Sequence, residues 1–198
     1  GDYMVRPPQP PVYFFVIDVS EAAVSSGMIR STVNAIRSAL DHLPGQPRTQ
    51  VGFITFDAHI HFYNLKASLS APQLLVISDI TDPIMPLPED LLVNLQDSRK
   101  VVDALLDALP TMFHKNLQPA ADASAPIASM APSNSCLGPA LMAAKRVIQH
   151  VGGKLCLFQA SLPNLGEGAL KMRENPRLLG TDKEHTMLNA EDPWYKTQ

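Results

Sequence analysis

The sequence predicts an α/β fold with a mainly parallel sheet, an antiparallel hairpin at one edge and helices on both faces. Residues 12–17 (VYFFVI) are consecutive apolar residues without alternation, which is typical of a parallel strand covered on both faces. A helical spacing of apolar residues follows over 29–43. The strand-like segments 50–57 and 59–65 are separated by so few residues that they indicate a tight antiparallel hairpin.

The remaining elements of the first half can be placed around these. The run RPPQPP at 6–11 cannot be helical and is expected to lead, extended, into the first strand, which ends at Asp18. The following helix ends at Pro44-Gly45. Its apolar stripe is Ile29, Val33, Ile36, Leu40 and Leu43. Segment 73–78 (QLLVIS) predicts a short fourth strand.

The middle of the chain is predicted to contain one helix between two proline-rich stretches. A loop with several prolines covers 79–88, a helix with one apolar face covers 98–109, and Pro110 is expected to end it. Residues 116–135 contain thirteen Ala, Ser or Pro in twenty positions. Such a stretch has too few large apolar side chains to offset the entropy cost of ordering, so it is predicted to be a low-complexity insertion within the domain.

The last predicted elements are one helix and one buried strand. Residues 137–151 have a helical pattern, with Pro139 tolerated in the first turn and Gly152-Gly153 after the end. Residues 154–159 (KLCLFQ) predict another buried strand. Beyond it we expect a loop and then a helix beginning at 193–196.

Composition and charge exclude several function classes. The 198 residues are 45% hydrophobic and carry a net charge of −3, so no basic surface for nucleic acid is expected. No apolar run approaches the ~20 residues of a membrane span. Two cysteines are too few for a disulfide scaffold or a zinc site, which favours a reducing, cytosolic setting. Eighteen prolines, about twice the usual share, indicate stiff and extended connections.

The carboxyl end of the first strand is where an open α/β sheet usually carries its function. Von Willebrand A-type domains have Asp-x-Ser-x-Ser there, whose oxygens hold a divalent cation. This sequence is similar in Asp18 and Ser20 but has Ala22 at the third position. Ser135 is the best match to the hydroxyl that such domains supply before a later helix, and no carboxylate follows the next buried strand until Glu167. We therefore predict a degenerate remnant at Asp18, Ser20 and Ser135 without a functional metal, the first two being loop and cap residues.

Other reactive side chains lack a motif. His59 and His61 alternate on one strand and share a face, but no third ligand lies at motif spacing, so exposed strand positions are the simpler interpretation. Cys136 and Cys156 have no cationic neighbour in sequence and are expected to be small buried side chains. Ser161 follows a strand but lacks a Gly-x-Ser-x-Gly context. The sequence predicts no catalytic residue and no cofactor-binding residue.

Several segments closely resemble one protein family. The two most specific are RPPQPP-x-Y and LGPAL. Together with the others they cover nearly the whole chain, from Tyr3 to about Lys196, in the family's order. This chain is similar over that length to the trunk domain of the cargo-adaptor subunit of the COPII coat (the Sec twenty-four family). The segments are 3–13, 15–20, 48–53 with 55–57, 60–63, 137–141 and 162–166.

The resemblance implies a von Willebrand A-like (Rossmann-type) trunk with a decayed cation site, in agreement with Ala22 and Gln159. It implies a non-catalytic inner-coat subunit for ER-to-Golgi vesicle transport. Such a subunit forms a heterodimer, trunk to trunk, with the GTPase-activating coat subunit and selects cargo and SNARE sorting signals. It would be cytoplasmic and peripheral on the endoplasmic reticulum membrane and COPII vesicles, recruited through that partner and its small GTPase.

The resemblance also sets the expected domain organisation. Residues 1–198 would form one trunk domain truncated at both ends, because the family's zinc finger precedes Tyr3 and further domains follow Lys196. No cofactor is expected in these residues, since the zinc belongs to the upstream finger. The 116–135 insertion is longer than the resemblance accounts for.

Two alternatives from other function classes stay open. One is a metal-dependent von Willebrand A-type protein-binding module in which Asp18, Ser20 and Ser135 still hold Mg²⁺. The other, less supported, is a hydrolase that uses Ser161. The leading interpretation expects a large interface and expects the substitution Asp18→Ala to be tolerated, and it does not specify the protein-binding residues.

Overall fold

The centre of the structure is a mixed six-stranded sheet with the order β4-β3-β2-β1-β6 and with β5 paired to β2. The structure is a computed structural model of the chain and describes residues 9–86, 88–114, 133–171, 177–188 and 193–197. The strands are β1 (Val12–Asp18), β2 (Gln50–Phe56), β3 (Ile60–Asn64), β4 (Gln73–Ile77), β5 (Val93–Asn94) and β6 (Lys154–Phe158).

Strand pairing agrees with the predicted parallel centre and edge hairpin. β1 runs parallel to β2 on one side and to β6 on the other, so that Phe15 faces Phe53 and Cys156. β2 and β3 form the antiparallel hairpin. The α/β class is confirmed, and the antiparallel part extends further than one hairpin because β4 also pairs antiparallel with β3, and β5 with β2.

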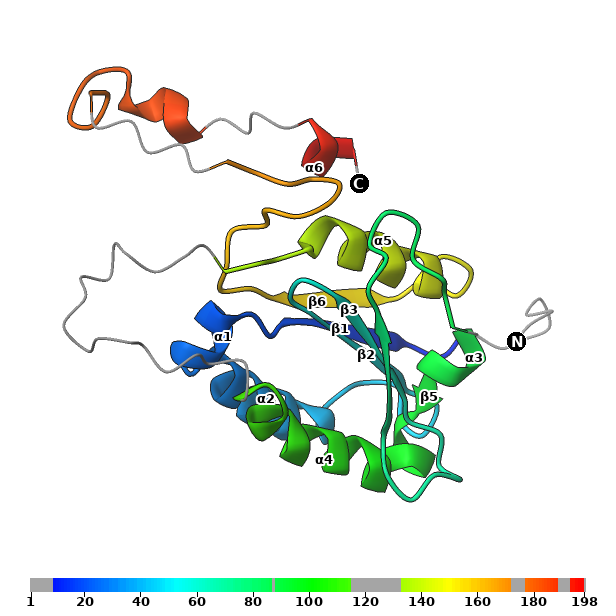
Figure 1. Cartoon of the computed structure of the whole chain (residues 1–198). Helices are drawn as coiled ribbons and strands as arrows, with labels where there is room; N and C mark the ends of the chain where they lie inside the picture. The colour runs from blue at the N-terminus through cyan, green and yellow to red at the C-terminus, as the bar shows by residue number, and fades with distance from the viewer. Residues whose placement is uncertain (1–8, 87, 115–132, 172–176, 189–192, 198) are drawn as a thin grey trace.

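Helices cover both faces of the sheet, as predicted. Helices α1, α2 and α4 lie on one face and α5 lies on the other (Figure 1). The helices are α1 (Glu21–Ser25), α2 (Met28–Leu40), α3 (Pro88–Leu91), α4 (Leu95–Met112), α5 (Leu137–Ile148) and α6 (Trp194–Thr197), and a 3₁₀ helix covers Glu184–Leu188. No helix in the described ranges is long and apolar enough to span a membrane.

The unbroken apolar run of β1 is explained by these two layers. Successive side chains of a strand point to opposite faces, so Phe15 and Ile17 join the core under α2 and α4. Phe14 and Val16 join the second core, under α5. Every residue of β1 is buried, which is why the strand shows no polar alternation.

Four helix boundaries differ from the prediction. Helix α2 ends at Leu40, before the predicted end at Pro44-Gly45. Helix α4 begins at Leu95 because the side-chain oxygen of Asn94 caps it, accepting from two backbone N–H groups, and it continues through Pro110 to Met112. The prediction that Pro110 ends the helix was wrong. Proline removes one backbone hydrogen bond, and only two residues follow Pro110 in the helix, so the loss falls in the last turn. Helix α5 ends at Ile148, three residues earlier than predicted.

The strand β6 is less buried than predicted. It was expected to be covered on both sides, but it lies at the end of the strand order, with β1 as its paired neighbour. Lys154 and Leu157 are exposed and the other three residues are half-buried. The predicted 116–135 insertion lies outside the described residues except for 133–135, and the predicted extended run at 6–11 is described only from residue 9.

Candidate functional site

The candidate site lies at the carboxyl end of β1, where Asp18 is fully buried. Its Oδ1 accepts a hydrogen bond from the backbone N–H of Ser20 at 2.8 Å. Its Oδ2 accepts from the N–H groups of Ala160 and Ser161, both at 2.9 Å, and from the Ser161 hydroxyl at 2.7 Å. The carboxylate therefore ties the end of β1 to the segment that follows β6, and both oxygens are engaged by donors of the chain itself.

Ser20 has the role of a helix cap. Its hydroxyl oxygen accepts from the N–H of Ala23 at 3.4 Å, at the start of α1. Ala22 stands at the position where the cation-binding pattern has its third oxygen ligand. Its backbone N–H donates to the hydroxyl of Ser133 at 3.0 Å. Both observations agree with the interpretation of Asp18 and Ser20 as loop and cap residues.

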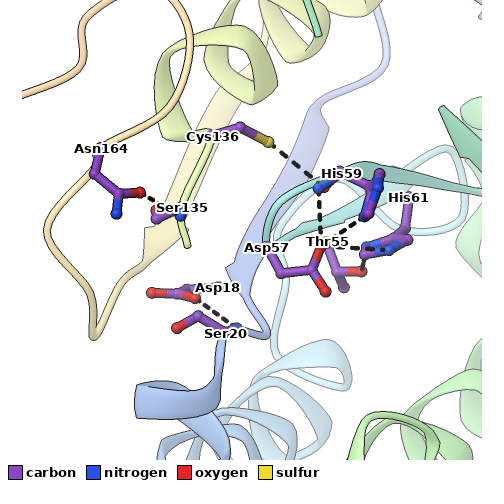
Figure 2. A network of polar contacts seen from close by, with 9 residues as sticks. All are labelled: Asp18, Ser20, Thr55, Asp57, His59, His61, Ser135, Cys136 and Asn164. Carbon is purple, nitrogen blue, oxygen red and sulfur yellow. Dashed lines mark hydrogen bonds and ion pairs between the residues drawn. The ribbon is translucent and has the colours of Figure 1, made fainter. Parts of the chain in front are cut away.

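Ser135 lies in the segment that leads into α5, at the same end of the sheet as Asp18 and Ser20 (Figure 2). Its backbone is held by Asn164: the Ser135 N–H donates to Asn164 Oδ1 at 2.8 Å, and the Ser135 carbonyl accepts from the Asn164 N–H at 3.0 Å. The Ser135 hydroxyl is buried and has no hydrogen-bond partner among the described residues. Among the three residues of the predicted remnant, all of which the structure describes, Ser135 is the one whose side-chain oxygen is buried without any hydrogen-bond partner.

The donor set fits a divalent cation poorly. Mg²⁺ requires six oxygen ligands in near-octahedral geometry, usually with one or two carboxylates. Asp18 supplies one carboxylate whose oxygens already accept four hydrogen bonds. After β6, Gln159 stands where a second carboxylate would be expected, and its side-chain amide donates to the Ser161 carbonyl. Within the described part of the chain, no three His, Cys, Asp or Glu side chains are arranged to hold a metal.

A second polar network surrounds the β2–β3 hairpin, and its histidines differ from the prediction. His61 is buried, so the prediction of an exposed strand position was wrong for this residue. Its Nδ1 lies 3.1 Å from Thr55 Oγ1, which in turn lies 2.8 Å from the Tyr63 hydroxyl. Burial lowers the pKa of His61, an effect that nearby Asp57 opposes. Burial also raises the pKa of the Tyr63 hydroxyl.

His59 precedes β3 and is half-buried, with 45% of its side chain exposed, so the predicted exposed strand position holds only in part. Its Nδ1 lies 3.6 Å from Asp57 Oδ1, and His61 Nε2 lies 3.8 Å from the same oxygen (Figure 2). Thr55 comes from β2 and both His61 and Tyr63 come from β3, so each side chain is positioned by the hairpin register. The side chains of Thr55, His61 and Tyr63 are hydrogen-bonded to one another within the hairpin, which is a structural role.

The cysteines and Ser161 lie in different surroundings. Burial raises the pKa of the Cys136 thiol to about 12, and the thiol donates to the His59 carbonyl at 3.5 Å. Cys156 lies half-buried on β6, so the expectation of a buried side chain holds fully only for Cys136. The Ser161 hydroxyl donates to Asp18 Oδ2 at 2.7 Å, so a carboxylate lies within hydrogen-bond reach of it, and the same oxygen also accepts from the N–H groups of Ala160 and Ser161. The prediction that no residue is catalytic stays a prediction.

The segments 137–141 (LGPAL) and 162–166 (LPNLG), both part of the family resemblance, pack directly against each other. A Cβ on Gly138, in the first turn of α5, would lie 1.8 Å from the Glu167 carbonyl oxygen, so only glycine fits there. Gly166 has a φ of +74°, and a Cβ on it would lie 2.6 Å from Pro139 Cγ. Asn164 completes the contact through Ser135. Sequence reasoning missed this role of Asn164 and Gly166, although Pro-Asn-Leu-Gly is a recognisable turn signal.

The family model of the Sec23/Sec24 trunk domain matches residues 8–197. The chain belongs to this family. It is 55% identical over 196 residues to the protein transport protein SEC24 A of Arabidopsis thaliana, covering 98% of this chain and 18% of that protein. It is 48% identical over 196 residues to the human protein transport protein Sec24A, covering 99% of this chain and 17% of that protein.

A solved structure supports the same assignment. The crystal structure of the human COPII-coat protein Sec24c matches with a TM-score of 0.78 at 34% identity, over 97% of this chain and 24% of that chain. The resemblance predicted from the sequence is therefore confirmed at the level of family and fold. The chain spans less than a fifth of the length of the two transport proteins named above.

Proposed function

We propose that this chain is the trunk domain of a non-catalytic inner-coat subunit of COPII vesicles. In this role it binds a paralogous trunk domain, that of the GTPase-activating coat subunit, while the whole protein selects cargo and SNARE sorting signals. The proposal places the protein in the cytoplasm, peripheral to the endoplasmic reticulum membrane, where it contacts the small GTPase only through its partner. The single observation that carries it is the trunk-domain match over residues 8–197.

The site geometry is consistent with a scaffold. In this fold the sheet's carboxyl edge is the usual place for a ligand. Here the Asp18 carboxylate is occupied by the backbone and hydroxyl donors of residues 20, 160 and 161. Such a cluster adds rigidity at the strand ends without offering an open position to a substrate or a cation. We infer that binding occurs through the domain surface, without a cofactor in these residues.

A binding experiment tests the proposal. The partner trunk domain is immobilised, and the retention of the purified chain on it is measured. The control is a von Willebrand A-type domain that has the same fold and an intact Asp-x-Ser-x-Ser pattern. We expect retention of this chain only. Failure of this chain to bind, where a full-length relative binds under the same conditions, contradicts the proposal.

A metal-dependent binding module is the second candidate, because one observation favours it. The buried Ser135 hydroxyl has no hydrogen-bond partner in the described segments and lies at the same end of the sheet as Asp18 and Ser20. A thermal-shift titration with Mg²⁺ separates the two functions, since a ligand that binds only the native state raises Tm with concentration. A flat response supports the scaffold, and a rise that Ser135→Ala abolishes supports the metal-dependent module.

A further inference from the structure

We draw no further inference here: the strongest candidate, the cavity of about 310 Å³ between helix α5 and the loop that follows β4, is lined by both a basic residue, Arg146, and an acidic one, Glu167, and nothing in the described residues shows which kind of ligand fills it.

Discussion

Replacing Asp18 by alanine should destabilise the domain, although sequence reasoning expected the change to be tolerated. The substitution removes the acceptor of three backbone N–H groups and one hydroxyl. A buried donor without a partner costs about 1–3 kcal/mol. The donors of Ser20 and Ser161 are buried, whereas that of Ala160 is only partly so. Relief of the buried charge offsets part of the loss, so we expect a net loss of about 3 kcal/mol in the free energy of unfolding.

Urea denaturation measures this loss, read from the midpoint at constant m-value. Ser161→Ala is the matched control, because it removes only the hydroxyl donor and keeps the backbone bond to Asp18. It should lose about 1.5 kcal/mol, the lower end of the range for a hydrogen bond to a charged group. If Asp18→Ala is within about 0.5 kcal/mol of the wild type, the range of an ordinary surface substitution, then the carboxylate does not tie the strand ends together.

Three further outcomes follow from other parts of the structure. Gly138→Ala should lower the urea midpoint although alanine favours helices, because the new Cβ meets the Glu167 carbonyl; an unchanged or higher midpoint contradicts that packing. His61, whose pKa is lowered by burial, contributes stability that is complete above about pH 6.5 and is lost as the pH falls through its folded value. The free energy of unfolding should therefore fall more steeply from pH 7 to 5 in the wild type than in His61→Gln, and equal slopes would exclude this contribution. Titration of the native chain with a thiol reagent at pH 8 should modify Cys156 but not Cys136, whose pKa is about 12; rapid modification of both would contradict the buried position of Cys136.

The fold was predictable where the apolar pattern of a segment depends directly on which of its faces are covered. The unbroken apolar run of β1 indicates that both faces of this strand are covered. The gap between β2 and β3 is so short that it allows only a hairpin. The boundary at Pro110 was not predictable in this way, because proline is tolerated when few residues follow it in a helix. The exposure of β6 depends on which strands flank it, and strand order is not encoded in the local pattern of 154–158.

The sequence predicted the missing ligands of the candidate site better than it predicted the hydrogen bonds that the site contains. Ala22 and Gln159 are visible in the sequence as positions without a carboxylate or hydroxyl. Three of the four donors that engage Asp18 are not visible, because they come from residues more than 140 positions away and two of these three are backbone N–H groups. His61 was misplaced for a similar reason: alternation gives the face of a strand but not whether that face is covered.

The most direct test of the central claim is the dissociation constant for the partner trunk domain, measured by calorimetry with and without Mg²⁺. A scaffold whose Asp18 is already engaged by the chain should bind equally well in both conditions, so the account predicts the same Kd within twofold. No binding in either condition, or binding that requires Mg²⁺, would contradict it.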